Sequence, residues 1–403
     1  MRWLIPNLPE LALVLLLFKK ILSMVKKSTI FMMVVWMLLN PIISNAMDSI
    51  SGSPLQISPQ FPFHLFYTLF DPDSAELIKT GKVQASVGFI QTNIISAGVN
   101  SFLYYNERDI WDSGQFKICK NYKGGSTSYN WNCKSDGYSI LFDGEVSQRV
   151  FRLNWGVTDY IEIQYINKSI RFMNGNMDRT IENVHENFDL TGGGRQWTDL
   201  NNLEVYLWDN ETDQAIFQLT DETGYQKLSE TFVLKLKILE NPKHWTLSGK
   251  IASNFNDEYL WTDLNEIKSQ NPTQHNDFDD LNLSLYFTGI WDNLVFHSAI
   301  SQTQIQSPYF SQSPDRIQFL FLGVTWIQDS FVLIMQDLIY SSIFPSDSRE
   351  SMGHEINELT LGSRFKITPY FRLETGIVEN LFTHGVINID FSYYVSMNWE
   401  LPG

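Results

Sequence analysis

The amino-acid sequence predicts an all-β fold, a single antiparallel transmembrane β-barrel of about 12 strands with one short amphipathic helix. Apolar and polar residues alternate with a period of two in many segments, and these segments are long, about ten residues each. Aromatic residues gather near the segment ends. Because a period of two puts successive side chains on opposite faces, each predicted strand has one apolar and one polar face.

Composition and charge narrow the class of protein. Of the 403 residues, 14% are aromatic and only 18% are charged, which argues against a disordered chain or a coiled coil. The formal net charge is -16, and Lys and Arg form no basic stripe. Because nucleic-acid binders need clustered cations to displace phosphate counterions, we expect no nucleic-acid partner. No sequence repeat or domain-length linker appears, which favours one domain.

Residues 1–46 are predicted to be a signal peptide. Two apolar runs, 11–18 and 30–39, each lie beside a pair of lysines. The second follows a basic region that starts at Met24, and it leads through Pro41 to small residues that end at Ala46. We expect cleavage after Ala46, a true start at Met24, an upstream extension over 1–23 and a barrel domain over 47–403. The alternative is a pair of membrane anchors, but both runs are shorter than the ~20 residues of a spanning helix.

Two cysteines, Cys119 and Cys133, lie in the polar stretch 117–137. In an oxidising compartment they are predicted to form a disulfide. A bridge over so short a segment stabilises one loop by roughly 3 kcal/mol and does not hold the fold together. A metal site lacks ligands, because this stretch has neither a Cys-x-x-Cys pair nor a nearby His.

The final segment shows the alternation most clearly. Its apolar positions are Ile389, Phe391, Tyr393, Val395, Met397 and Trp399. The same period recurs at 161–165, 234–238, 281–285, 358–366 and 371–377. The polar face often holds charges, as where Lys235 and Lys237 alternate with leucines. A soluble sandwich buries the apolar face and a lipid-embedded barrel exposes it, and the alternation does not distinguish the two.

Segment length, aromatic positions and connection lengths favour the barrel. The aromatic residues near strand ends are Tyr104, Tyr105, Trp155, Trp291, Trp326, Tyr370, Tyr393, Tyr394 and Trp399. They fit the aromatic girdles of membrane interfaces. Short connections, 154–159 and 366–370, alternate with long polar ones such as 253–280. This is the pattern of tight periplasmic turns and long outer loops.

Three segments depart from simple alternation. Residues 317–322 and 331–335 are apolar on both faces, so the sequence does not show which of their side chains point outward. Within 140–155 the polar residues move from odd positions to even ones, and a bulge or turn near Arg149 and Val150 would restore the register.

One segment has a helical period. Residues 178–188 place Ile181, Val184, His185 and Phe188 on one face, and three glycines follow at 192–194. We predict a short helix that lies in the lumen as a partial plug or at the barrel mouth. We expect it to join a charge network with the barrel wall, made of Asp143, Glu145, Arg149, Arg152, Asp178, Glu182, His185 and Arg195.

The motifs that suggest enzymes are incomplete. Glu182 and His185 match half of a di-iron motif with no second copy, and His297 and Ser298 point to opposite faces of a strand. Asp143 and Glu145 lie side by side rather than across a substrate. We therefore expect no enzyme, no cofactor and no metal. The acidic loop at 276–280 is read as a solvated outer loop, with Ca²⁺ as the alternative.

Several motifs, taken in order, resemble the bacterial family catalogued as domain of unknown function 3187. They are Leu141-Phe-Asp143-Gly-Glu145, Trp155-Gly-Val-Thr-Asp159, Asp178-Arg-Thr-Ile181-Glu182-Asn-Val-His185, Phe188-Asp-Leu190 and Arg195, with 53–62 and 375–380 near the ends. The resemblance implies an exported β-barrel of the Gram-negative outer membrane with no established activity. Two departures are Ile251-Ala-Ser-Asn-Phe in place of a Leu-Pro-Thr-Gly type turn, and an end at Trp399-Glu-Leu-Pro-Gly rather than at an aromatic residue.

Three hypotheses for function stay open. The first is a pore or channel that passes small solutes through a charged lumen in the cell outer membrane. The second is a non-conducting structural or adhesive surface barrel, and the third is a secreted soluble β-sandwich that binds a ligand. For the barrels, the expected partners are outer-membrane lipid, lipopolysaccharide and the barrel-assembly machinery.

Overall fold

The computed structural model describes most of the chain after residue 51. The described residues are 52–61, 64–65, 70–97, 138–179, 181, 183, 201–209, 214–255, 280–305, 314–328, 331–343, 355–380 and 387–401. The chain divides into two units, 1–46 and 47–403. The predicted signal peptide, residues 1–46, lies outside the described residues, and so do Cys119 and Cys133.

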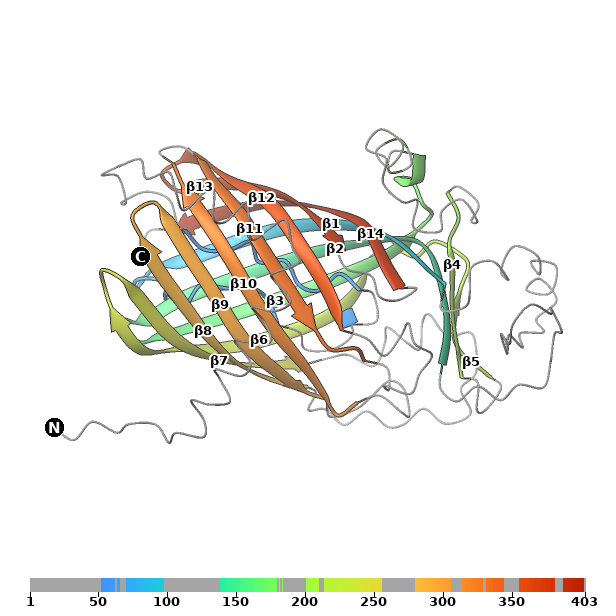
Figure 1. The fold of residues 1–403 in the computed structure, drawn as a ribbon, viewed down its shortest axis with the longest axis horizontal. Coiled ribbons are helices and arrows are strands. Elements are labelled where there is room, and N and C mark those ends of the chain that lie inside the picture. Colours follow the sequence, from blue (N-terminus) through green and yellow to red (C-terminus); the bar gives the residue numbers. More distant parts are fainter. Residues whose placement is uncertain are drawn as a thin grey trace, which may run out of the picture. The chain divides into compact units, whose positions relative to one another are not determined.

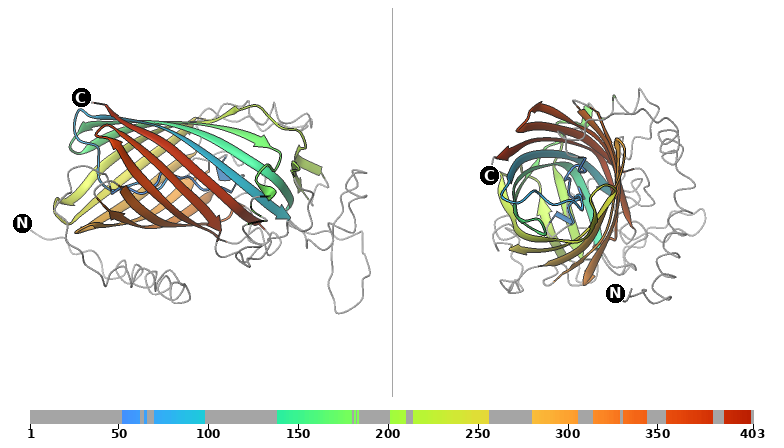
Figure 2. Two further views of the ribbon diagram at one scale, coloured as in Figure 1. Left: turned by 90° about the horizontal axis from the view of Figure 1, so that it is seen from above. Right: turned by 90° about the vertical axis from the view of Figure 1, so that its left-hand side faces the viewer.

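The described residues form fourteen strands, and all of them except β4 and β5 close into one antiparallel barrel of twelve strands (Figures 1 and 2). The strands are β1 Val83–Ala97, β2 Tyr138–Thr158, β3 Ile161–Met173, β4 Glu204–Asp209, β5 Gln214–Leu219, β6 Gln226–Asn241, β7 Trp245–Phe255, β8 Leu281–Trp291, β9 Leu294–Gln304, β10 Arg316–Ile327, β11 Phe331–Tyr340, β12 Ile356–Thr368, β13 Phe371–Asn380 and β14 Ile387–Leu401. From β14 back to β6 the order follows the sequence, then come β3 and β2, and β1 pairs with both β14 and β2 to close the circle. The hairpin of β4 and β5 extends β2 at one end. The predicted fold class and strand number are confirmed.

Short and long connections join strands at opposite ends of the barrel. Turns at 159–160, 242–244, 292–293 and 369–370 join strands at one end, where β1 also begins and β14 ends. We call this the turn end. The strand ends that flank the long connections 98–137 and 256–279 lie at the other end, the loop end. The turn predicted over 154–159 is shorter than expected, because β2 continues to Thr158.

The outer face of the barrel is apolar and the inner face is polar. Leu283 and Ile300 are 52% and 60% exposed on the outside, whereas the lumen-facing Arg152 and Lys235 are 2% and 1% exposed. A soluble β-sandwich has the reverse arrangement, since it buries its apolar faces. A barrel with an apolar exterior and a charged interior is instead the arrangement of membrane-spanning β-barrels.

Strand β2 keeps one register with β1 from Leu141 to Trp155, and its pairing with β3 shifts only between Gly156 and Thr158. The bulge predicted near Arg149 and Val150 is therefore wrong. Odd-numbered residues of β2 face outward throughout. Near the loop end these outward residues are polar because the connection from β3 to β6 covers them, as where Glu145 accepts a hydrogen bond from Met177 N.

The two segments without a clear phase form part of an apolar wall in the lumen. On β10, Ile317, Phe319 and Phe321 are buried on the inner face. On β11, Val332 and Ile334 are buried as well. Their outer faces belong to the apolar exterior of the barrel, and their inner faces are apolar because they pack against a chain segment inside the barrel.

Only the start of the predicted helix is described. Asp178, Arg179, Ile181 and Asn183 are helical, and Ile181 N–H donates to Met177 O at 3.0 Å. The remainder up to residue 188 lies outside the described residues, so the helix as a whole is not shown. In the described part of the chain, no helix is both long and apolar enough to cross a membrane.

Candidate functional site

The lumen holds a segment of the chain that precedes β1. We define the luminal segment as residues 52–82, of which 52–61, 64–65 and 70–82 are described. The blue trace of these residues runs inside the ring of strands in Figure 2. Pro54, Pro59 and Pro72 favour extended backbone and remove hydrogen-bond donors, so this segment crosses the lumen without joining the sheet. Most of its described side chains are buried.

The first half of the segment runs from the turn end to the loop end. His297, near the start of β9, donates from Nε2 to the carbonyl oxygen of Gly52 at 2.7 Å. Gln60 N–H then donates to a carboxylate oxygen of Glu358, near the loop end of β12, at 2.8 Å. Between them, the side-chain amide of Gln336 both accepts from Leu55 N and donates to Leu55 O, each at 3.0 Å.

The second half returns to the turn end. Ile78 N–H donates to Glu162 at the start of β3, at 2.8 Å. Gly81 N–H then donates to Gly156 O at 2.8 Å, and Gly156 N–H donates to Lys82 O at 3.0 Å. The φ of +79° at Gly81 forms the tight turn into β1. A Cβ at Gly156 would collide with the carbonyl oxygens of Ile78 and Lys79. The segment thus enters and leaves the lumen at the same end.

Two aspartates of the returning half form ion pairs with the wall at the centre of the lumen. Their partners are Arg152 (β2) and Lys168 (β3), each 3.2 Å from Asp71, and Lys235 (β6) and Lys250 (β7), 3.2 Å and 3.7 Å from Asp73. These four strands are consecutive neighbours in the sheet. All six side chains are buried, so the strands form one basic arc around two acidic residues of the segment.

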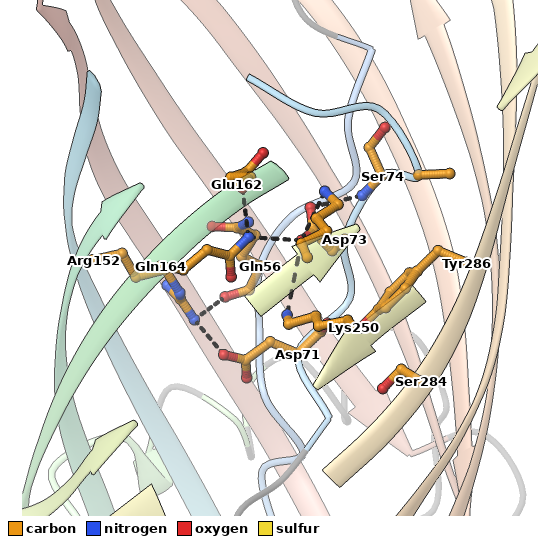
Figure 3. Close-up of polar contacts among 12 residues, drawn as sticks. Gln56, Asp71, Asp73, Ser74, Arg152, Glu162, Gln164, Lys250, Ser284 and Tyr286 are labelled. Carbon is orange, nitrogen blue, oxygen red and sulfur yellow. Dashed lines mark hydrogen bonds and ion pairs between the residues drawn. The ribbon is translucent and has the colours of Figure 1, made fainter. Parts of the chain in front are cut away.

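Further hydrogen bonds complete this cluster (Figure 3). Arg152 donates to the backbone oxygen of Gln56 at 2.8 Å as well as to Asp71. Gln164 donates to Asp73 at 3.2 Å and to Glu162 at 2.7 Å. Arg152 therefore binds both passes of the luminal segment, the first through the Gln56 backbone and the second through Asp71.

The basic arc stabilises the two aspartates as anions. Burial by itself disfavours a charged carboxylate. The positive charges of Arg152 and Lys168 at Asp71, and those of Lys235 and Lys250 at Asp73, oppose that effect.

An aromatic arc continues the wall beyond the basic arc. The Phe70 ring stacks on Tyr286 of β8 with a centroid distance of 5.4 Å, and lies 5.9 Å from both Phe319 and Phe321 of β10. Lys250 Nζ lies 5.6 Å from the centroid of the Tyr286 ring, within reach of a cation–π contact. In Figure 3, Lys250 lies between Asp73 and Tyr286, where the two arcs meet.

Besides the basic arc and the aromatic arc, residues of β12 and β13 also bind the luminal segment. Arg364 pairs with Glu374 at 2.6 Å and donates to the carbonyl oxygens of Ser53 at 3.0 Å and Pro54 at 3.3 Å. Tyr394, which the sequence placed in an aromatic girdle, instead lies in the lumen and donates to Glu374 at 3.0 Å. Beside these residues, a cavity of about 50 Å³ remains at the turn end.

The family of the chain follows from its sequence match. Residues 122–401, more than half of the chain, match the family described as "Protein of unknown function (DUF3187)". The chain belongs to the DUF3187 family. The resemblance seen in the motifs is thus confirmed, and it assigns no activity. No curated protein matches the chain.

Solved structures similar to this DUF3187 chain are outer-membrane proteins. One is the COG4313 outer membrane channel from Pseudomonas putida F1, with 10% identity, a TM-score of 0.44, and coverage of 82% of this chain and 100% of that one. The NanC porin has 10% identity, a TM-score of 0.39, and coverage of 66% and 98%. The Pseudomonas putida toluene transporter TodX has 9% identity and a TM-score of 0.32, and the match covers 79% of this chain and 88% of that one. TM-scores this low carry no argument, so the fold rests on the strand pairing of the chain itself.

The structure divides the described residues of the predicted charge network between the lumen and the outer side of β2. Arg152 lies in the lumen, whereas Asp143, Glu145 and Arg149 belong to the outward-facing residues of β2. Asp178 is buried and accepts from Asn93 at 2.8 Å. Glu145 and Asp178 lie close together, because Glu145 accepts from Met177 N, next to Asp178. The remaining predicted members, Glu182, His185 and Arg195, lie outside the described residues. Among the described residues, no group of three or more His, Cys, Asp or Glu side chains has the arrangement of a metal site.

Sequence reasoning missed the luminal segment. It lacks the period of two, and its prolines indicate only an extended chain. One available signal was Lys235 on the polar face of its strand, because a lysine that is buried in a barrel lumen requires an anionic partner. The acidic pair in Phe70-Asp71-Pro72-Asp73 was the candidate partner.

Proposed function

We propose that this DUF3187 protein is an outer-membrane channel for small solutes, and that the luminal segment closes it in the state described here. The observation that carries the proposal is a closed barrel with an apolar exterior and a charged lumen, occupied by a segment that is not part of the sheet. Export by the predicted signal peptide, contact with lipid and lipopolysaccharide, and insertion by the barrel-assembly machinery belong to the same proposal. So does the absence of an enzymatic activity.

The way the segment is held favours a channel over a purely structural barrel. The barrel closes through the pairing of β1 with β14 and β2, and none of the strands comes from residues 52–82. Wall side chains provide most of the contacts to the segment, as with Gln336 and Arg364. The described part of the segment before Gly81 can therefore leave the lumen without breaking a strand pair, while Gly81 and Lys82 stay bonded to Gly156.

Single-channel recording of the full chain in a planar bilayer tests the channel. We expect the wild-type protein to be closed most of the time, with infrequent steps of current. The variant Asp71→Asn/Asp73→Asn leaves the basic arc unpaired, and breaking one buried ion pair costs about 3–5 kcal/mol. Since 1.4 kcal/mol is a factor of about ten, the open probability should rise at least about tenfold.

A matched control removes the same charge outside the lumen. Asp221 and Asp292 are exposed, and Asp292 has a φ of 52°, which Asn tolerates well. The variant Asp221→Asn/Asp292→Asn should therefore behave as the wild type. Each protein is shown to be folded by its heat-dependent mobility on gels. If the folded and inserted luminal variant gives no current steps, the protein is a non-conducting barrel.

A further inference from the structure

We propose that the lumen accepts small organic anions with an aromatic body, and that the luminal segment occupies their place in the closed state. This inference rests on the proposed channel, because it names the class of solute that the channel takes. It is argued from the basic arc, the aromatic arc and the residues that cover both.

The basic arc provides the site for an anion. Its four cations come from four neighbouring strands, and the side chains are buried. Within the described residues, Arg152 Nε has no acceptor, so the arc is not saturated even with the segment in place. When the segment leaves, Asp71 and Asp73 leave with it, and the wall keeps Glu162 as the nearby carboxylate. The excess of positive charge then favours anions over cations.

The aromatic arc provides the site for a ring. Tyr286, Phe319 and Phe321 are buried and face the lumen. Tyr286 lies on β8, next to β7 of the basic arc, and the two phenylalanines lie on β10. Lys250 joins the two arcs, because its ammonium group lies near both Asp73 and the Tyr286 ring. A carboxylate attached to a ring can therefore pair with a cation while its ring stacks on the aromatic wall.

The luminal segment shows how both arcs are filled together. In Phe70-Asp71-Pro72-Asp73, the Phe70 ring stacks on Tyr286 while the carboxylates pair with the basic arc. The segment also fixes the Tyr286 hydroxyl group, which donates to the backbone oxygen of Asp71 at 3.1 Å. A ring beside carboxylate groups is the chemistry of an aromatic carboxylate, so the segment acts as an internal mimic of one.

The test measures block and binding with benzoate as the probe. Full-chain Asp71→Asn/Asp73→Asn is recorded in potassium chloride while benzoate, acetate or benzylammonium is added. Burial of the ring should let benzoate block at a concentration at least about tenfold below acetate, and benzylammonium should not block. Tyr286→Ala should remove the advantage of benzoate over acetate, whereas Lys250→Gln should weaken block by both anions.

Direct binding in detergent provides a second readout. In equilibrium dialysis, benzoate should bind the variant at least about tenfold more tightly than the wild type, whose segment competes for the site. Phe70→Ala serves as a second variant, because it vacates the place of the ring and leaves the ion pairs intact. It should also bind benzoate more tightly than the wild type.

The outcomes separate this inference from the proposed channel. Equal block by benzoate and acetate in a variant that conducts would overturn the inference and leave the channel. Benzoate binding to a folded barrel that never conducts would overturn the channel and support the site. A folded variant with neither conduction nor binding would overturn both.

Discussion

Two glycines of the wall allow the luminal segment to pack closely against it. Gly362 and Gly376 are directly opposite each other on β12 and β13, and the Leu55 side chain lies against both. A Cβ at Gly376 would lie 2.9 Å from Leu55 Cδ1, closer than van der Waals contact allows. The absence of side chains at these positions is therefore what allows Leu55 to be fully buried.

Gly376→Val is expected to displace the luminal segment. Inserting a side chain into a well-packed site costs about 1–3 kcal/mol. The strain falls on the closed state, so the open probability should rise roughly 5–150-fold, the ratio that this range of free energy gives. Single-channel recording measures it.

Gly249→Val is the matched control for that substitution. Gly249 lies on β7, and the nearest atom to its added Cβ, Ile238 Cδ1, is 3.4 Å away, an ordinary contact. This variant should keep the wild-type open probability. If both valine variants opened the channel equally, closure by contact with Leu55 would be wrong.

The sequence predicted single luminal residues where a strand was regular. Lys235 is on the polar face of a clear alternation, and it is luminal in the structure. Tyr394 also alternates, but its aromatic ring suggested a membrane interface, whereas its hydroxyl group binds Glu374 inside the barrel. Residue type was misleading there because a tyrosine suits both environments.

At the scale of the elements, the strands carry an apolar band that ends in aromatic residues. Tyr160, Trp291 and Tyr370 are exposed at the turn end. The ring of Phe371 contacts Trp399 at the same end, with centroids 5.5 Å apart. This distribution matches an aromatic girdle at one membrane interface.

A charge in the middle of this band should destabilise the inserted barrel. Leu285 is exposed at the centre of β8, and Leu285→Arg should destabilise the barrel in lipid vesicles by about 2–4 kcal/mol. Leu239 is exposed near the turn at 242–244, and Leu239→Arg should cost only about 0–1 kcal/mol. Denaturant titration of vesicle-inserted protein measures both. Equal costs would contradict the placement of β8 in lipid.

The sequence predicted strands well but did not predict what fills the barrel. Alternation requires only that the two faces of a strand meet different surroundings, and the strands meet lipid and a polar lumen. Residues 317–322 lost their alternation because Phe70 packs on their inner side. In β2, polar residues such as Ser147 lie on the outer face, where another part of the chain covers them, and Ser147 forms a hydrogen bond with Tyr225 there. These outward polar residues suggested a change of phase that the strand does not have. Both failures arise from contacts between distant parts of the chain.

For the whole molecule, the central claim is that the luminal segment closes a barrel that is complete without it. The segment and the wall meet at a position suited to a reversible lock. Ser74 Oγ lies 3.4 Å from Thr288 Oγ1, so cysteines at these two positions would bring their sulfur atoms close enough to bond after a small shift.

The most direct measurement is the current through Ser74→Cys/Thr288→Cys before and after reduction. With the disulfide formed, as verified by mass spectrometry, the lock should abolish current steps, and dithiothreitol should restore them in the same bilayer. The wild type under the same reduction controls for Cys119 and Cys133. Steps that persist with the lock closed would contradict closure by the luminal segment.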